Sequence, residues 1–362
     1  MKFRTAFIIP VLILAWTVAT FALGHDDRRE DKARAQQVER TASADSNVAV
    51  SVCLTSGTIS VRGWDRTEVR ARSRDVADLE LRRRDATPES SPAKKIEVLI
   101  SDRAEGPAGR LSSCRAFSDI ELDVPRGATV QLQTRDGNIN VTDVAKAYVN
   151  TQSGDIRLER ASQSVDAGCI GGNITLKDSS GRISLHSLSG SIEAIGVRPA
   201  EGADSFDVSS VSGDITLDRV GHAHVNARTT SGSLSMSGPL AHGGNYGFKT
   251  LSGDVTLTLP ADSSFKLSAT VSQNAEIITD FPVTLTTEAS TPAKPSMPPT
   301  PAAPPTDAKA PRDDGSKKGV IVSTRKVVVV IPGYKHFYAI YGTGDATIYV
   351  ASFSGTIHLR KK

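Results

Sequence analysis

Short stretches in which apolar and polar residues alternate make up most of this chain, and glycine-containing turns separate them. Alternation of this kind is typical of β-strands that bury one face. One phrase, Ser-Gly-polar-aliphatic-polar-aliphatic, recurs at residues 153–158, 212–217 and 252–257. Looser copies begin near eight other glycines, namely Gly57, Gly137, Gly172, Gly181, Gly190, Gly232, Gly344 and Gly355. The recurrence predicts an array of stacked repeats.

Seven glycines from the strict and looser copies of this phrase form one column, and their spacing gives the length of a repeat. They are Gly137, Gly154, Gly172, Gly190, Gly213, Gly232 and Gly253, at successive differences of 17, 18, 18, 23, 19 and 21 residues. Each interval corresponds to one rung. Gly181 lies halfway between two of them, which indicates two corners and two strands per rung. The 23-residue interval contains a turn-rich insertion at residues 197–202, which we expect to bulge from the stack.

Alignment on these glycines sorts the other residues into columns of shared character. The positions two and four after the glycine and five before it are apolar in every rung, as in Ile156, Leu158 and Val149. Because side chains alternate between the two faces of a strand, these columns predict two β walls around one aliphatic core. Stacking in a solenoid requires such agreement between equivalent positions.

The corner that contains the glycine has its own polar columns. Three residues before the glycine stands Thr, Ser or Cys169, small side chains suited to hydrogen bonds with the backbone. Directly after the glycine stands Asn, Asp or Ser, and no two neighbouring rungs both carry a charge there. Rungs lie about 4.8 Å apart, so stacked carboxylates would repel. We expect the glycine itself to adopt a positive φ at this corner.

The columns predict an all-β fold, a parallel β-solenoid with two strands per rung of about 18–20 residues. Less regular strands are expected to cap both ends, because a repeat stack otherwise exposes unpaired strand edges. The expected segments are a signal peptide at 1–24, a flexible charged spacer at 25–46, an N-terminal β cap at 47–125, solenoid repeats at 126–285, a Pro-rich disordered loop at 286–318 and C-terminal strands forming a cap at 319–362.

The N-terminus has the three parts of a secretory signal: Lys2 and Arg4, an apolar run at residues 7–21, and small residues at 22–24. We therefore expect an exported protein of the periplasm or the cell surface. An uncleaved N-terminal anchor is the alternative to cleavage, and it is the one contact with a membrane that the sequence suggests.

Charge argues against a nucleic-acid partner. Without Lys2 and Arg4 the chain has 41 basic and 40 acidic residues, so it is close to neutral. A nucleic-acid-binding protein concentrates basic residues on one surface. The one candidate stretch, residues 62–84, intersperses acidic residues among Arg70, Arg72 and Arg74, and we interpret it as a solvated strand face.

Three cysteines in an exported chain raise the question of a disulfide. The register places Cys169 inward and Cys53 outward, so these two do not pair. Cys53 with Cys114 is the candidate bridge, since both lie in the less regular N-terminal part.

The rungs, together with Gly-Thr-Ile-Ser-Val-Arg-Gly-Trp-Asp at residues 57–65 and Asp-Val-Pro-Arg-Gly-Ala at residues 123–128, resemble the bacterial putative-adhesin domain of unknown function. The similarity spans roughly residues 47–362, and the Pro-rich insertion departs from a compact version of the domain. The resemblance implies a secreted or envelope β-solenoid. It implies no reaction, cofactor or catalytic residue.

Candidate chemistry is sparse. The outward strand column offers one carboxylate, Glu193. Asp214 and Asp254 are separated by one rung, roughly 10 Å, which is compatible with an inverting glycosidase pair, although turn aspartates favour a structural interpretation. The chain has no Gly-Gly-x-Gly-x-Asp calcium motif. His222, His224 and His242 have no Cys or carboxylate nearby at ligand spacing, so we interpret them as residues of a solvated loop. No catalytic, cofactor-binding or metal-binding residue is predicted.

These observations favour a non-enzymatic, adhesin-like envelope protein with a polar repeat surface for a glycan or an envelope protein. Two alternatives stay open. One is a self-assembling envelope scaffold, which the exposed ends of a repeat stack suggest. The other is a polysaccharide-active β-helix enzyme with its site in a cap or at residues 198–204.

Overall fold

The computed structural model describes residues 37–74, 76–85, 91–102, 114, 116–271, 276–288, 320–322, 327–330 and 335–362, which belong to one unit, Gln37–Lys362. All regular elements among these residues are strands. None of them lies in a helix long and apolar enough to cross a membrane. The expected signal peptide, the spacer up to residue 36 and the Pro-rich segment from residue 289 to 318 lie outside the described residues.

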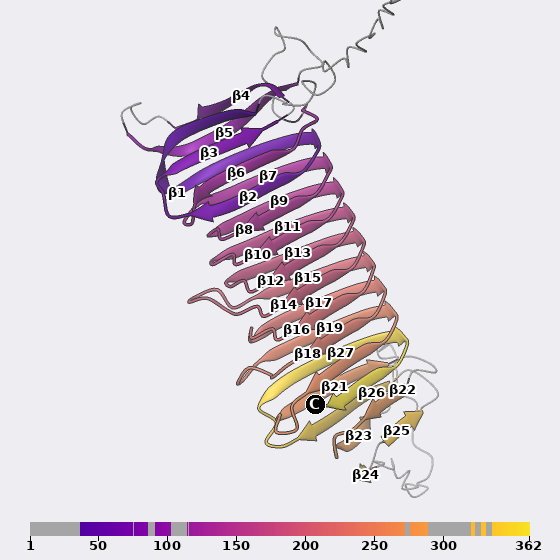
Figure 1. Cartoon of the computed structure of the whole chain (residues 1–362). Helices are drawn as coiled ribbons and strands as arrows, with labels where there is room; N and C mark the ends of the chain where they lie inside the picture. The colour runs from indigo at the N-terminus through magenta and orange to yellow at the C-terminus, as the bar shows by residue number, and fades with distance from the viewer. Residues whose placement is uncertain are drawn as a thin grey trace, which may run out of the picture. The chain divides into compact units, whose positions relative to one another are not determined.

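Long and short strands alternate through the middle of the chain (Figure 1). They are β7 (Thr129–Asp136), β8 (Ile139–Thr142), β9 (Lys146–Ser153), β10 (Ile156–Glu159), β11 (Ser164–Gly171), β12 (Ile174–Lys177), β13 (Arg182–Ser189), β14 (Ile192–Ile195), β15 (Phe206–Ser212), β16 (Ile215–Asp218), β17 (His224–Ser231), β18 (Leu234–Ser237), β19 (Asn245–Ser252) and β20 (Val255–Leu259).

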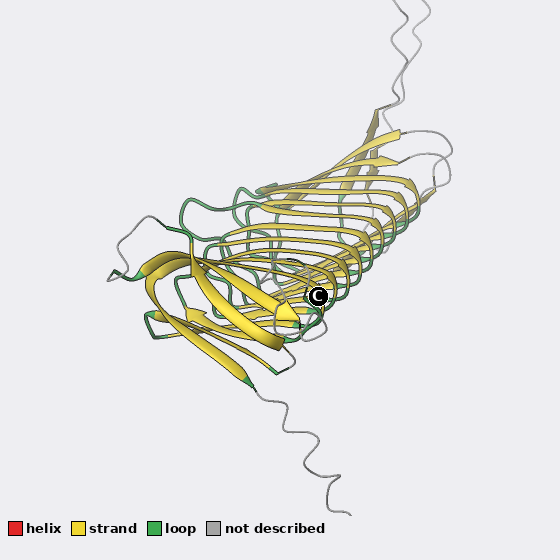
Figure 2. Cartoon of the chain, turned by 90° about the horizontal axis from the view of Figure 1, so that it is seen from above, coloured by secondary structure: helices red, strands yellow, loops and turns green. Residues whose placement is uncertain are grey.

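Each long strand pairs in parallel with the next long strand, and each short strand with the next short strand. The two resulting parallel sheets are called here the long-strand sheet and the short-strand sheet. Figure 2 shows tight turns joining them on one side and longer loops on the other. The register keeps equivalent residues opposite one another, as in Ile156 with Ile174. The predicted parallel β-solenoid with two strands per rung is therefore confirmed.

The core is one strip of side chains between the two sheets. In the repeats, the three columns predicted to face inward are all at most 2% exposed. A fourth inward column begins the long strands, and a fifth follows the short strands at the loop side. The fourth contains Val130, Ala147, Val165, Ile183, Phe206, Val225 and Tyr246, and the fifth includes Val144, Ala161, Val197 and Val220.

The ends of the stack are interleaved in space. β1 (Val38–Ser56) lies between β5 (Ala93–Asp102) and β7, and β2 (Ile59–Trp64) lies between β6 (Ile120–Pro125) and β8. At the other end, β27 (Ala346–Ser354) lies between β19 and β21 (Phe265–Val271), and β28 (Ile357–Lys361) lies between β20 and β22 (Glu276–Thr279). The first and the last described strands are thus inner rungs of the stack.

Antiparallel strands finish the parallel stack at both ends. At the N-terminal end, β3 (Glu68–Ser73) pairs with β1 and β6, and β4 (Val76–Arg83) pairs with β5. At the C-terminal end, β26 (Lys335–Tyr341) pairs with β21 and with β23 (Thr284–Glu288). The remaining pairs are β22 with β25 (Val327–Val330) and β23 with β24 (Val320–Val322). Such pairing covers edges that would otherwise recruit another chain.

Two boundaries differ from those expected. β1 begins at Val38, nine residues before the expected start of the cap, and its first part pairs with β3. Ala44 is fully buried there, but small inward alanines among charged neighbours give little hydrophobic signal. β23 continues to Glu288, inside the segment expected to be a loop from residue 286.

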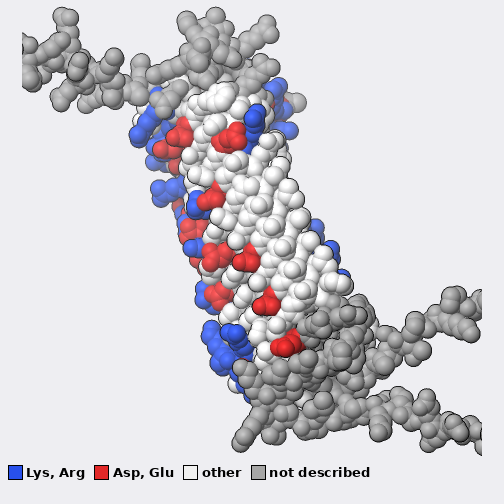
Figure 3. All heavy atoms as spheres, turned by 90° about the vertical axis from the view of Figure 1, so that its right-hand side faces the viewer, with Lys and Arg blue, Asp and Glu red and all other residues white. Residues whose placement is uncertain are grey.

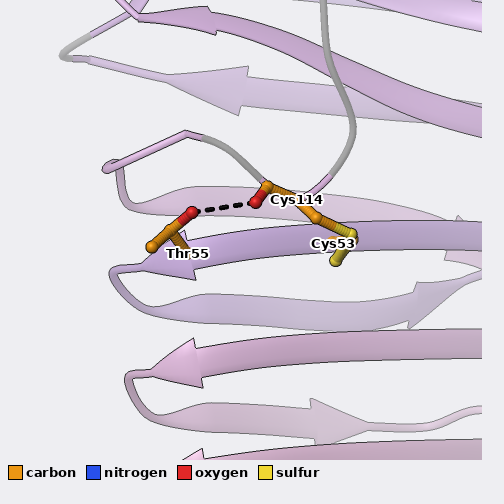
Figure 4. The surroundings of a disulfide bond; sticks show 3 residues. All are labelled: Cys53, Thr55 and Cys114. Atoms are coloured by element: carbon orange, nitrogen blue, oxygen red, sulfur yellow. Dashed lines mark hydrogen bonds between the residues drawn. A yellow bond between two sulfur atoms is a disulfide. The ribbon is translucent and has the colours of Figure 1, made fainter.

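A disulfide joins Cys53 of β1 to Cys114 (Figure 4). The Cys114 backbone N–H donates to the Cys53 carbonyl at 3.0 Å, and the Thr55 hydroxyl donates to the Cys114 carbonyl at 2.9 Å. The Thr55 backbone N–H continues this pairing to Ala116 at 3.0 Å. The bridge therefore fixes an added piece of backbone along the outer side of β1.

Candidate binding surface on the long-strand sheet

The seven predicted glycines stack in one column at the tight corner, and Gly57 and Gly355 extend the column at its two ends. A Cβ at Gly137 or at any later member would collide with the carbonyl oxygen of the glycine in the preceding rung. Five of the seven have φ between 126° and 152°: Gly154, Gly172, Gly190, Gly232 and Gly253. Gly137 and Gly213 do not have a positive φ. The predicted positive φ therefore explains the glycine at only five of the seven corners. Close backbone stacking is the cause that all seven share.

The column after the glycine is a ladder of side-chain to backbone hydrogen bonds. Ser233 N–H donates to Asp214 Oδ1 at 2.8 Å, and Thr356 N–H donates to Asp254 Oδ1 at 2.7 Å. Asn138 Oδ1 accepts in the same way from Asp155 N–H at 2.9 Å. Figure 3 shows acidic side chains spaced along this side of the stack, several of them surrounded by uncharged surface. The two aspartates considered as a catalytic pair therefore hold neighbouring rungs together.

The hydroxyl groups three residues before the glycine also form hydrogen bonds within the stack. Thr229 Oγ1 donates to the Gly213 carbonyl at 3.1 Å, and Thr250 Oγ1 donates to the Gly232 carbonyl at 3.2 Å. Cys169 Sγ takes the same place, 3.6 Å from the Gly154 carbonyl. Burial raises the pKa of the Cys169 thiol. Thr134 and Ser187, in the same column, have hydroxyls without a hydrogen-bond partner among the described residues, so part of the column is hydrogen-bonded across the tight corner.

The three histidines considered for a metal site have separate surroundings. His222 lies in a loop as expected, but it is fully buried, which corrects its interpretation as solvated; its Nε2 lies 2.7 Å from the Gly181 carbonyl oxygen. Its ring lies 5.6 Å from that of Phe206 and fills the core below the inserted loop. His224 is 4.0 Å from Asp204, and His242 is 2.9 Å from Asp345. No group of three metal-binding side chains occurs among the residues that the structure describes.

The arginines of residues 62–84 are more ordered than a solvated face. Arg70 Nη2 and Arg72 Nη2 lie 2.8 and 3.1 Å from Asp123 Oδ2, and Asp123 is buried. The Arg70 guanidinium also covers the Trp64 ring at 4.8 Å. These contacts join β3, β6 and β2 in the N-terminal cap.

The outer face of the long-strand sheet contains a hollow of about 630 Å³ over β17, β19, β27 and β21. It exists because one outward column has no side chain at Gly247, whereas the paired residues on either side are Asn226 and Tyr349. Ala351 adds a second small residue to the floor. A gap in an otherwise filled row of side chains is what a binding pocket on a flat sheet requires.

Polar and charged side chains surround this hollow. The Asn226 amide donates to Asp207 Oδ1 at 3.2 Å and accepts from Arg228 Nε at 3.2 Å. Thr270 Oγ1 and His336 Nδ1 lie 2.9 Å apart at the far side. Lys249 makes no hydrogen bond or ion pair with any residue in the described ranges. The hollow thus combines fixed polar groups with one cation that has no partner there.

A second hollow, of about 520 Å³, lies on the same face over Gly168, where the outward side chain is again missing. Asn150 and His186 flank it in the neighbouring rungs. His186 is itself held between the hydroxyls of Ser184 and Ser209, each 2.8 Å away. The lining of this hollow contains no Lys, Arg, Asp or Glu side chain among the described residues.

An exposed apolar column follows the tight corner, two residues before the glycine. Its members, called here the apolar corner ridge, are about half exposed and comprise Ile170, Leu188, Val211, Leu251 and Phe353. Sequence reasoning missed both the ridge and the hollows. The signal was present, since these positions share one column of the glycine register and Gly247 and Gly168 interrupt outward columns.

A family model, Toastrack DUF4097, matches residues 66–288, more than half of the chain. This chain belongs to the Toastrack DUF4097 family. The match confirms the resemblance inferred from the rung motifs, and it includes all seven corner glycines together with the hollow-lining residues of β15, β17, β19 and β21. No curated protein matches this Toastrack chain in sequence.

Two solved structures are similar to this Toastrack protein. One is a putative cell adhesion protein from Clostridium sporogenes ATCC 15579, with 11% identity and a TM-score of 0.19, covering 90% of this chain and 100% of the other. The second is a putative adhesin from Parabacteroides merdae ATCC 43184, with 10% identity and a TM-score of 0.31, covering 63% and 90%.

Proposed function

We propose that this Toastrack protein is an exported, non-enzymatic envelope protein that works as an adhesin-like binding module. The observation that carries the proposal is the hollow on the outer face of the long-strand sheet, with polar side chains and Tyr349 around a floor of Gly247 and Ala351. Concave sites of this size with a few convergent polar groups are typical of ligand binding. The partner is a glycan or an envelope protein.

The arrangement of the corner aspartates supports a binding role over hydrolysis. An inverting glycosidase needs one carboxylic acid and one carboxylate free to act on the sugar and on water. In both Asp214 and Asp254, Oδ1 accepts a hydrogen bond from a backbone N–H of the next rung. Turnover of a polysaccharide by the purified protein, abolished by Asp214→Asn or Asp254→Asn, would overturn the non-enzymatic assignment.

Export and location are tested in intact cells. The motivation is the signal-like sequence at residues 1–24. The tagged full chain is treated with protease in its own host before and after lysis. Cleavage in intact cells places the protein on the surface, and protection until lysis places it in the periplasm. Retention of the full-length chain in the cytosolic fraction would contradict export.

A self-assembling scaffold is the second candidate, and the apolar corner ridge is the observation that favours it. The ridge presents apolar side chains in successive rungs, as at Leu188 and Val211, and exposed apolar patches mark association surfaces. Light scattering of the full chain at rising concentration tests this function. Concentration-dependent growth that Leu188→Ser reduces, with the surface Thr230→Ser change as control, supports a scaffold; a monomer at all concentrations excludes it.

A further inference from the structure

We infer that the hollow over Gly247 takes an acidic saccharide, a short segment of a uronate-bearing glycan whose carboxylate binds Lys249 and Arg228. This inference rests on the proposed binding function and narrows its ligand. The two cations are neighbours across the pair β17 and β19, since Arg228 lies opposite Lys249 in the register. Both line the hollow.

The charges that face the hollow favour an anion. Arg228 and Lys249 are the cations of the lining, which also includes His224 and His336, and Asp207 is its single carboxylate. The Asp207 carboxylate accepts a hydrogen bond from the Asn226 amide, which ties it to the neighbouring strand. Arg228 Nε contacts Asn226, which leaves the guanidinium Nη groups to meet a carboxylate.

The uncharged part of the lining suits a sugar ring. Gly247 and Ala351 give a flat floor, and Tyr349, 48% exposed, stands at its edge. An aromatic ring offers an apolar face to the C–H groups of a sugar, while Asn245 and Ser268 offer groups for its hydroxyls. Rungs repeat about every 4.8 Å, so a linear polymer that crosses them meets the side chains of one outward column in succession.

A peptide fits this site less well. Extended peptides bind sheets mainly by adding a strand at an exposed edge, where backbone groups are free. The hollow lies on the face of the sheet, and the backbones of β17, β19, β27 and β21 are paired with neighbouring strands. An acidic peptide would therefore have the charge contacts alone.

The test is calorimetric titration of the full chain with three probes: trigalacturonic acid, its neutral methyl ester and a short poly-glutamate peptide. We expect trigalacturonic acid to bind at least about tenfold more tightly than either control, with an affinity that falls as salt rises. Lys249→Gln and Arg228→Gln should each weaken binding about tenfold. Lys146→Gln, a lysine of the same face in β9 outside the hollow, is the matched control.

The outcomes separate the two levels of the proposal. Equal binding of the acid and its methyl ester overturns the acidic-ligand inference and leaves a glycan-binding surface. Equal or tighter binding of poly-glutamate overturns the saccharide assignment. No binding of any glycan on a broad array, with unchanged circular dichroism and thermal unfolding, contradicts the glycan form of the proposed function itself. Tyr349→Ala should weaken both saccharides and leave poly-glutamate unaffected.

Discussion

At the scale of single residues, backbone packing sets the requirements of the tight corner. Gly213 lies against the carbonyl group of Gly190 in the preceding rung and does not have a positive φ. Other residues could therefore adopt its backbone conformation, but the Gly190 carbonyl leaves no room for their Cβ atom. The same carbonyl contact recurs from Gly137 to Gly355, so one added methyl group disturbs the separation of two rungs.

We predict that Gly213→Ala lowers the free energy of unfolding by about 1–3 kcal/mol, the usual cost of overpacking. Gly221→Ala is the control, since a Cβ there meets its nearest neighbours at 3.7 and 3.8 Å and the residue has no positive φ. Urea unfolding midpoints of the two variants measure the difference. Equal midpoints would mean that the rungs shift apart without cost.

Burial gives His222 a pH-dependent role in stability. Its Nε2 faces the Gly181 carbonyl, so the neutral ring carries its proton there, and Nδ1 has no hydrogen-bond partner. Burial lowers the pKa of His222, with the Gly181 contact and Asp204 opposing the shift. The folded state therefore takes up a proton less readily than the unfolded state.

We predict that the stability contributed by neutral His222 is complete above pH 6.5 and is lost as the pH falls from 6.5 through its lowered folded pKa. Unfolding free energies measured between pH 5 and 7.5 should show this slope in the natural protein, and His222→Gln should reduce it. His242→Gln, on an exposed side chain, is the control. An identical slope in all three proteins would assign the effect to other groups.

At the scale of elements, the N-terminal cap depends on contacts between segments far apart in sequence. The Cys53–Cys114 disulfide links residues 61 positions apart in the sequence. Asp123 of β6 forms ion pairs with Arg70 and Arg72 of β3. Neither set of contacts follows the rung repeat. The cap therefore depends on specific side chains as well as on the stacking of rungs.

We predict that the double change Cys53→Ser and Cys114→Ser lowers stability by about 2–4 kcal/mol, chiefly by freeing the unfolded chain. Chemical unfolding with and without a reductant measures this, and reductant should affect only the natural protein. Cys169→Ser is the control because its thiol is buried and unbridged. A natural protein insensitive to reductant would show that the bridge is absent or without effect on stability.

The elements that the sequence predicts are those that repeat. Periodic columns predict the strands from β7 to β20, their register and their inward faces, because stacked rungs repeat the same environment. They do not predict β1 before residue 47, where the inward residue Ala44 is small, nor the burial of His222, which depends on the inserted loop beside it. The sequence does not predict the hollow over Gly247, because a glycine in an outward column cannot be distinguished from a turn glycine.

At the scale of the whole described unit, the interleaved ends make the last strands part of the central stack. Ile348 of β27 lies opposite Tyr246 of β19 and Leu267 of β21, and it is fully buried. A C-terminal strand at the edge of a stack would tolerate change, since terminal elements fray at little cost. This one has a parallel neighbour on each side.

We predict that Ile348→Ala costs about 2–5 kcal/mol, as a large-to-small change in a packed core does. Ile183→Ala, in the same inward column within the middle of the stack, should cost about as much. Thermal or urea unfolding of the two variants gives the comparison. A negligible effect of Ile348→Ala beside a large effect of Ile183→Ala would place β27 at a frayed edge.

The same interleaving bears on how the protein is made. Chains are synthesised from the N-terminus, and segments begin to fold as they emerge. Every rung from β7 to β20 can settle on the rung made just before it, but β21 finds its parallel neighbour only when β27 has been synthesised. Assembly of the stack is therefore sequential through its middle, whereas its C-terminal end is completed only when β27 and β28 reach β21 and β22.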